Sequence, residues 1–263
     1  MVRWRARVNP SRAVLPTHSS RWVGVLAVVG LVGTVTAVAW LAGMPTPTAS
    51  AGTIAAGAAP AVPRPQPVVL TTARAGGKVV ALTFDDGPTA RYTPQILDVL
   101  ARNHAVATFC EIGQQARAQP ALVRRVVAGG HRLCDHTITH DPRIGSRPPA
   151  VIDQQLRTSR DVLRAASGGA DVDYFRAPNG VWTPALVRVS AQDGMQPLGW
   201  AVDTRDWTRP GAPALVDLVK RHVRPGAIIL FHDGGGPRDQ TVAAVRQLLP
   251  WLSAQGYSFV LPG

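Results

Sequence analysis

The chain has 263 residues, of which 46% are hydrophobic, and a formal net charge of +12 at pH 7. Its length is enough for one domain of catalytic size once an unusual N-terminal segment is set aside. The positive charge suits an anionic partner such as a cell wall, a membrane surface or a nucleic acid, but no basic run is interleaved with aromatic residues, which argues against nucleic-acid binding.

The N-terminal segment is basic and then strongly apolar. Residues 1–21 contain five arginines and no acidic residue, and residues 22–43 include a run of 20 uncharged residues, Val23–Ala42. A helix that spans a bilayer needs about 20 such residues, and the basic side of such a helix stays in the cytoplasm. We therefore expect the rest of the chain to be extracytoplasmic.

Two interpretations of this segment remain open. The apolar run is longer than the roughly 7 to 15 residues of an ordinary signal-peptide core, which favours a membrane anchor. Ala49-Ser50-Ala51 has the small-x-small form of a signal peptidase site, which favours a secreted protein cleaved after Ala51. The chain beyond residue 51 has 23 basic and 16 acidic residues, so a net charge of +7 remains in either case.

Residues 44–77 and 78–263 differ sharply in composition. The first range is dominated by Pro, Ala, Thr and Gly and predicts an extended linker. The second alternates short apolar runs with amphipathic ones. We expect strands at Val79–Phe84, Ala107–Glu111, His131–Asp135, Asp173–Arg176, Gln196–Val202, Ala227–Phe231 and Tyr257–Leu261. We expect helices near Thr93–Leu100, Pro120–Ala128, Ala150–Ala166, Pro184–Gln192, Pro213–His222 and Thr241–Ala254.

Strands that alternate with helices predict a parallel α/β fold. A barrel-like closure would gather the carboxyl ends of the strands around one site. The periodicity alone also fits an open, doubly wound sheet.

The first expected strand ends in two adjacent carboxylates. Val79–Phe84 is an apolar run typical of a buried parallel strand, and Asp85 and Asp86 follow it directly, before a Gly-Pro turn. Two like charges side by side are costly unless a cation holds them. Because catalytic groups in α/β folds lie at the carboxyl ends of strands, this pair is a candidate site.

A pair of histidines follows the third expected strand. His136 and His140 are four residues apart, a spacing at which two imidazoles can bind one metal ion. Histidines at this spacing are also common as solvated or hydrogen-bonded side chains. The residue after His136 is a threonine, so the His-Glu-x-x-His pattern of metalloproteases does not apply.

Three further expected strands end in charged, imidazole or aromatic groups. These groups lie in Arg176–Gly180, Asp203–Trp207 and Leu230–Asp233. Each segment alone fits a structural ion pair or a polar loop. Five such strand ends together indicate one site at one edge of the sheet.

These five segments resemble the motifs of the polysaccharide deacetylase family with the NodB homology domain, also called carbohydrate esterase family 4. The family motifs are Thr-Phe-Asp-Asp-Gly, His-Ser/Thr-x-x-His, Arg-x-Pro-Tyr/Phe, Asp-x-x-Asp-Trp and Leu-x-His. They stand in the family order at Thr83–Gly87, His136–His140, Arg176–Asn179, Asp203–Trp207 and Leu230–His232. The resemblance covers residues 78–263 and implies a distorted (β/α) barrel of about seven parallel strands.

The resemblance also implies a metal site and a base. Asp86, His136 and His140 would bind a divalent metal, usually zinc, with cobalt or another divalent ion as alternatives. Asp85 would act as the general base and Arg176 would position it. The metal would leave one coordination position for the attacking water.

The remaining motif residues would supply the acid and the pocket. His232 would act as the general acid, oriented and charge-tuned by Asp206. Trp207 and Leu230 would shape the pocket, with Leu230 against the acetyl methyl group. Asn179 stands where the family usually has an aromatic residue, so the main-chain N–H that the family uses in its oxyanion hole is kept but a sugar contact through an aromatic ring is not expected.

Cys110 and Cys134 are the only cysteines in the sequence. Each lies in an expected strand, and the two strands are consecutive. Neighbouring strands are about 4.8 Å apart, a distance that permits a disulfide, and an exported domain favours one. The alternative is two small buried apolar side chains.

The expected activity is metal-dependent removal of acetate from N-acetylglucosamine units of an extracellular glycan, with peptidoglycan preferred because of export and positive charge. Chitooligosaccharides and acetylated xylan are alternatives within the same fold. A catalytically inactive wall-binding protein is the alternative from another class. We expect a monomer, with the membrane as a further partner if the N-terminal segment is not cleaved.

Overall fold

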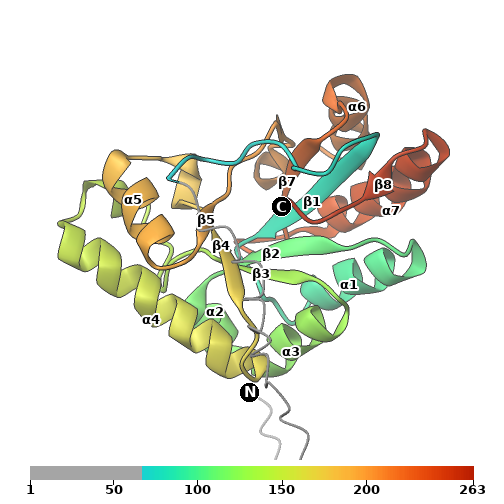
Figure 1. Cartoon of the computed structure of the whole chain (residues 1–263). Helices are drawn as coiled ribbons and strands as arrows, with labels where there is room; N and C mark the ends of the chain where they lie inside the picture. The colour runs from blue at the N-terminus through green and yellow to red at the C-terminus, as the bar shows by residue number, and fades with distance from the viewer. Residues whose placement is uncertain (1–66) are drawn as a thin grey trace, which may run out of the picture. The chain divides into compact units, whose positions relative to one another are not determined.

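The computed structural model describes residues 67–263 (Figure 1). The expected basic segment, the anchor or signal sequence and most of the expected linker lie outside these residues. Within residues 67–263, the helices are too short or too polar to cross a membrane.

Seven parallel strands form a curled sheet in the order β5-β4-β3-β2-β1-β7-β6. Their bounds are β1 (Val79–Asp85), β2 (Ala107–Glu111), β3 (Arg132–Asp135), β4 (Val172–Phe175), β5 (Gln196–Pro197), β6 (Val202–Asp203) and β7 (Ala227–His232). A short β8 (Ser258–Phe259) pairs with the start of β1. The expected distorted barrel of about seven parallel strands is confirmed, with β1 between β2 and β7.

The helices begin where prolines predispose the chain to turn. Five of those in the described chain have a proline in their first two positions, where its missing N–H costs nothing. The bounds are α1 (Thr93–Arg102), α2 (Gly113–Ala118), α3 (Pro120–Ala128), α4 (Pro149–Ser167), α5 (Pro184–Gln192), α6 (Ala212–His222) and α7 (Asp239–Ala254). The sequence pattern does not predict α2, because its six residues are too few to show a helical period.

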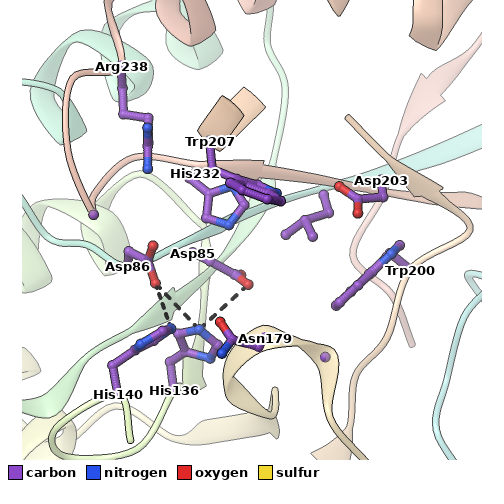
Figure 2. A pocket seen from close by; sticks show the side chains of 13 residues that line it. Asp85, Asp86, His136, His140, Asn179, Trp200, Asp203, Trp207, His232 and Arg238 are labelled. Atoms are coloured by element: carbon purple, nitrogen blue, oxygen red, sulfur yellow. Dashed lines mark ion pairs between the residues drawn. The ribbon is translucent and has the colours of Figure 1, made fainter. Parts of the chain in front are cut away.

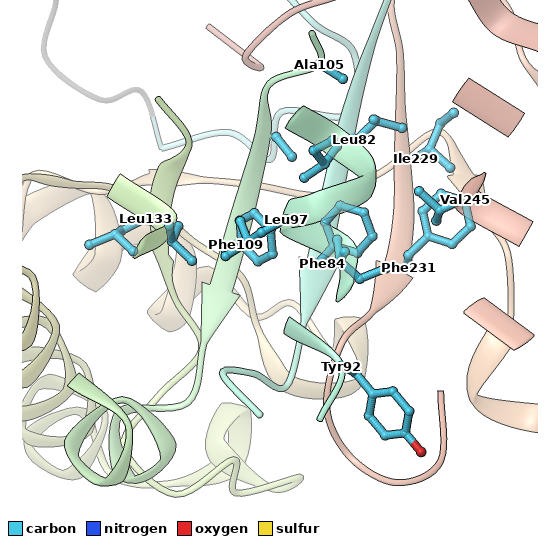
Figure 3. Close-up of a cluster of buried hydrophobic side chains, with 14 of the residues drawn as sticks. Leu82, Phe84, Tyr92, Leu97, Ala105, Phe109, Leu133, Ile229, Phe231 and Val245 are labelled. Atoms are coloured by element: carbon cyan, nitrogen blue, oxygen red, sulfur yellow. The ribbon is translucent and has the colours of Figure 1, made fainter. Parts of the chain in front are cut away.

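The outer face of the sheet packs against these helices and forms the main core. Alternate residues of β1 point to this face, and Phe84 lies between two rings from the neighbouring strands (Figure 3). Its centroid is 5.2 Å from that of Phe109 and 5.7 Å from that of Phe231. All three rings are buried, so the central strands are fixed directly below the point where the carboxylates emerge.

The inner face of the sheet carries smaller side chains. Ala81, Cys110, Cys134 and Ile228 belong to a second buried cluster on this face. Cys110 and Cys134 are register partners on β2 and β3 and form a disulfide, with their Cα atoms 4.1 Å apart. Because Asp85 is in register with Cys110, the disulfide lies beside the carboxyl end of β1.

The expectation of one strand at Gln196–Val202 is wrong. The segment forms β5 and β6, which lie at opposite edges of the sheet. Between them, the carbonyl oxygens of Leu198 and Gly199 accept hydrogen bonds from the guanidinium of Arg176 at 3.0 and 2.8 Å. An arginine side chain thus satisfies the main chain where a neighbouring strand is missing, and sequence periodicity carries no sign of that.

The last residues of the expected linker pack on the domain. Leu70 forms a parallel bridge with Leu198, and Thr72 an antiparallel bridge with Ala227. Gly199 donates from its N–H to Leu70 at 2.8 Å. The segment therefore lies across the gap between the two sheet edges.

Candidate active site

The carboxyl ends of five strands, β1, β3, β4, β6 and β7, surround one cavity of about 470 Å³. Eight of the ten catalytic, metal-binding and pocket residues expected from the sequence line it. The other two, Arg176 and Asp206, are fully buried behind the cavity wall. The five strand ends that the sequence singled out therefore do meet at one place.

Asp86, His136 and His140 form a compact group whose ligand atoms all lie within 4.8 Å of one another. Oδ1 of Asp86 is 3.5 Å from Nε2 of His136 and 3.3 Å from Nε2 of His140 (Figure 2). This oxygen is buried, and no group in residues 67–263 donates a hydrogen bond to it. Two imidazoles and one carboxylate are a donor set of open catalytic zinc sites, so the three residues fit a divalent metal.

The ring of His136 is held in the orientation that a metal ligand needs. Its Nδ1 lies 2.8 Å from the carbonyl oxygen of Arg176. With the proton on Nδ1, this nitrogen donates to the carbonyl, and Nε2 keeps its lone pair directed at Asp86. One main-chain contact thus fixes both tautomer and direction.

The electrostatics of the group favour a cation between these side chains. Burial opposes protonation of His136, but the charges of Asp85 and Asp86 outweigh it and raise the pKa of this imidazole. Burial also opposes ionisation of Asp86, yet the close contact with His136 and the charges of His136, His232 and His140 hold its pKa well below the usual range. The carboxylate is therefore ionised and available as a ligand.

Asp85 is paired with an arginine whose guanidinium is fixed by several hydrogen bonds. Its Oδ1 accepts from Nη1 of Arg176 at 2.7 Å, and its Oδ2 lies 3.8 Å from Nε2 of His136. Nη1 of Arg176 also donates to Oγ1 of Thr83 at 2.9 Å. Since the other guanidinium nitrogens bond the carbonyls of Leu198 and Gly199, the arginine is fixed and one oxygen of Asp85 remains directed at the metal group.

His232 is held by Asp206 on the opposite wall of the cavity. Nδ1 of His232 lies 2.6 Å from Oδ1 of Asp206, and the main-chain N–H of His232 donates to Oδ2 at 3.0 Å. Burial lowers the pKa of His232, but its bond to Asp206 and the charges of Asp206, Asp85 and Asp86 outweigh this and raise the pKa to about 9. The imidazole is therefore protonated at neutral pH.

The main chain around the cavity is strained. Among residues 67–263, seven non-glycine residues have positive φ, a region in which side chains are disfavoured. Five of them lie in the motif segments: Asp86, Thr137, His140, Asn179 and Arg205. Such conformations persist only where the surrounding structure holds them. At Asp86 the left-handed turn separates its side chain from that of Asp85.

Aromatic and apolar groups form the rest of the wall. Trp207 is 52% exposed, whereas Leu230 is buried at 4%, and both line the cavity with Asn179 and Trp200. Gly180 makes room for Trp200, because a Cβ at this position would collide with the indole. The open face of Trp207 is suited to contact a sugar ring.

Three residues around the site were not predicted from the sequence. Thr241 is fully buried in the first turn of α7 and donates from Oγ1 to Oδ2 of Asp206 at 2.7 Å. Trp200 and Arg238 line the cavity. Thr241 and Arg238 belong to the polar run Arg238-Asp239-Gln240-Thr241, which comes shortly after the last motif and its three glycines. This polar run beside a motif was the only signal in the sequence that these residues lie near the site.

Comparison with known proteins agrees with this geometry. Residues 72–198 match the family described as polysaccharide deacetylase. A chitooligosaccharide deacetylase of Sinorhizobium fredii is 43% identical over 192 residues, which cover 69% of this chain and 89% of that protein. The chain belongs to the polysaccharide deacetylase family. It is a hydrolase of carbohydrate esterase family 4, and the predicted family and enzyme class are confirmed.

Two further relatives show the range within the family. A peptidoglycan-N-acetylglucosamine deacetylase of Bacillus cereus is 37% identical over 185 residues, covering 70% of this chain and 85% of that protein. The crystal structure of a CE4 family pseudoenzyme from Bacillus anthracis has a TM-score of 0.68 and 27% identity, covering 74% of this chain and 67% of that one. The same fold thus occurs in a protein that is called a pseudoenzyme, so activity has to be argued from the site.

Proposed function

We propose that the protein is a metal-dependent N-deacetylase that hydrolyses the acetamido group of N-acetylglucosamine units in an extracellular glycan, most readily peptidoglycan. The observation that carries the proposal is that a metal-binding triad, a fixed carboxylate and a protonated imidazole face one cavity. This complete set also argues against the alternative of an inactive wall-binding protein.

Asp86, His136 and His140 would hold the metal. When bound, a divalent ion acts as a Lewis acid that lowers the pKa of a bound water and polarises the acetyl carbonyl. Zinc suits two imidazoles and a carboxylate, and cobalt shares this preference. Metal analysis of the purified protein, followed by chelation and re-addition of single ions, tests both the requirement and the identity.

Asp85 would take the proton from the attacking water. Its Oδ1 is bound to Arg176, so Oδ2, which lies 3.8 Å from Nε2 of His136, is the basic oxygen that faces the reacting centre. Arg176, fully buried and hydrogen-bonded through each of its guanidinium nitrogens, fixes the direction of Asp85. The base is therefore oriented before substrate binds.

His232 would protonate the leaving nitrogen. An amine is a poor leaving group unless it receives a proton. The raised pKa of His232 keeps the proton on the ring at neutral pH, and Asp206 directs Nδ1 so that Nε2 faces the cavity. The acid and the base thus stand on two walls with the acetamido group between them.

The negative charge that develops on the acetyl oxygen needs donors. The main-chain N–H of Asn179, on the left-handed turn after β4, is the donor that the protein itself would offer. Leu230, buried at the cavity wall, would contact the acetyl methyl group, and Trp207 would cover a sugar ring. These contacts would recognise the acetyl group. The rest of the glycan would contact other surfaces of the protein.

The preference for peptidoglycan is supported by charge and by a relative. Outside residues 1–51 the chain keeps a net charge of +7, which attracts an anionic wall. The Bacillus cereus relative carries a peptidoglycan name, whereas the Sinorhizobium relative carries a chitooligosaccharide name. We propose an extracytoplasmic location, reached by an N-terminal anchor or by secretion after cleavage following Ala51.

Acetate release from three glycans tests the substrate. We expect the highest kcat/KM on peptidoglycan, a lower value on N-acetylchitooligosaccharides and the lowest on acetylated xylan. Release from xylan alone would contradict N-deacetylation. Mass spectrometry of the mature N-terminus separates the anchor from the cleaved signal.

A further inference from the structure

Arg238 is a nearly buried cation at the cavity for which the proposed reaction has no use. It precedes α7, only 3% of its surface is exposed, and it lines the cavity beside Gly235. Figure 2 shows its guanidinium extending from the loop above Asp86 toward the cavity. It is the only lysine or arginine among the described residues that line this cavity.

Two of its three nitrogens are committed to the main chain. Nε donates to the carbonyl oxygen of Gly234 at 2.7 Å, and Nη1 donates to that of Pro237 at 3.1 Å. Within residues 67–263, Nη2 forms no hydrogen bond and the guanidinium forms no salt bridge with a carboxylate. The side chain is therefore held in place with one NH₂ group still available.

The carboxylate of Asp86 lies nearby, but it is already assigned to the metal. A Cβ at Gly235 would collide with Oδ2 of Asp86 and would lie 3.2 Å from Nη2 of Arg238. Asp86 and Arg238 therefore lie on either side of Gly235, without a hydrogen bond between them. A guanidinium does not lose its proton in proteins, and the charge of Asp86 would be shared with the metal that it binds. Nη2 of Arg238, which lines the cavity, therefore remains available to an anionic group of a bound glycan.

The opposite wall of the cavity has the opposite character. Asp203 lies there beside Trp200, across the cavity from Arg238 (Figure 2). An anionic group on a bound sugar is repelled by Asp203 and attracted by Arg238. Arg238 and Asp203 together would therefore favour one orientation of an acidic glycan in the cavity.

We propose that Arg238 is a specificity-determining residue that donates from Nη2 to a carboxylate on the glycan, close to the acetamido group that is hydrolysed. The inference rests on the proposed function and sharpens it toward acidic glycans. In peptidoglycan the matching group is the lactyl carboxylate of a muramic acid unit without its peptide. Chitooligosaccharides have no such group.

A matched pair of substrates tests the contact in the wild-type enzyme. One is the N-acetylglucosamine–N-acetylmuramic acid disaccharide with a free lactyl carboxylate, and the other is its lactyl methylamide. We expect kcat/KM to be about ten- to hundredfold higher for the acid, the range for one hydrogen bond to a charged group. Equal values for the acid and the amide overturn the proposal.

Arg238→Gln, with Arg246→Gln as a matched control, locates the preference. Arg246 lies on the exposed face of α7, so its replacement changes the net charge equally. We expect the ratio of the acid to the amide value to fall to about one in Arg238→Gln and to stay at the wild-type value in Arg246→Gln. An equal loss on both substrates in Arg238→Gln assigns the arginine to holding its loop and overturns the proposal.

Two further measurements test the proposal even if Arg238→Gln does not fold or if turnover cannot be measured. Arg238→Lys keeps the charge, and we expect it to retain part of the preference if Arg238→Gln does not fold. Isothermal titration of the wild-type protein with the two disaccharides gives the same ratio without turnover. If no glycan releases acetate, the proposed function fails, while equal binding of acid and amide contradicts the role of Arg238 by itself.

Discussion

The base side and the acid side of the cavity are built on the same plan with opposite charges. On one side Asp85 is held by Arg176, which is tied to Thr83 and to main-chain carbonyls. On the other, His232 is held by Asp206, which accepts from Thr241. In each case a threonine hydroxyl and the main chain orient the buried partner, and the partner orients the proposed catalytic group.

The two sides differ in which property of Asp85 or His232 the buried partner controls. Arg176 is fully buried and all three of its guanidinium nitrogens are hydrogen-bonded, so the base side is fixed in geometry. The acid side contains an imidazole whose pKa is lowered by burial but raised to about 9 by Asp206 together with the charges of Asp85 and Asp86. Arg176 would therefore hold Asp85 in position, whereas Asp206 would hold both the position of His232 and its proton.

Arg176→Met should have the largest effect on stability. It leaves Asp85 buried without its counter-charge and removes the donors for Leu198 and Gly199, which costs about 3–5 kcal/mol of unfolding free energy. Urea unfolding measures this loss. Arg176→Met combined with Asp85→Asn should recover part of it, and full additivity of the two changes would show that the pair is not coupled.

Asp206→Asn should lower kcat/KM by about 100-fold with a smaller loss of stability, since general acid catalysis contributes about 10²–10⁴. Without the carboxylate, burial dominates and the pKa of His232 falls. The acid must be protonated to act, so the alkaline limb of the pH–rate profile should move to lower pH. An unchanged limb would remove Asp206 from the tuning of His232.

Thr241→Val should have a smaller effect that separates position from charge. The change removes one hydrogen bond to Oδ2 of Asp206 at constant volume, so kcat should fall about tenfold. Because Asp206 keeps its charge, the alkaline limb should not move to lower pH as it does in Asp206→Asn. Thr241→Ser keeps the hydroxyl and should restore most of kcat; equal losses in both variants would assign Thr241 to packing alone.

Much of the fold could be predicted because the signals were local. The run Val79–Phe84 is continuous and apolar since β1 is covered on both faces, and the prolines that begin helices stand in the sequence itself. The division of Gln196–Val202 could not be predicted, because it depends on Arg176 reaching from a different strand to bind Leu198 and Gly199. A periodic pattern in the sequence shows which residues are buried. It does not show that β5 and β6 are buried at separate edges of the sheet.

The site divides in the same way. Residues in spaced motifs, such as Asp86 and His136, could be found because a chemical pattern marks them. Thr241 and Arg238 act through a single hydrogen bond or a free nitrogen, and nothing in their residue types distinguishes them from ordinary polar residues at the start of a helix. Only the folded chain brings Thr241 to Asp206, 35 positions away in the sequence.

The central claim is that the adjacent carboxylates Asp85 and Asp86 do different work, one on the proton and one on the metal. It is tested most directly by measuring bound metal and kcat on the same preparations of Asp85→Asn and Asp86→Asn. We expect Asp85→Asn to keep wild-type metal content with kcat lowered by at least about 100-fold, and Asp86→Asn to lose the metal as well as the activity. Loss of metal in Asp85→Asn, or full metal content in Asp86→Asn, would contradict the division.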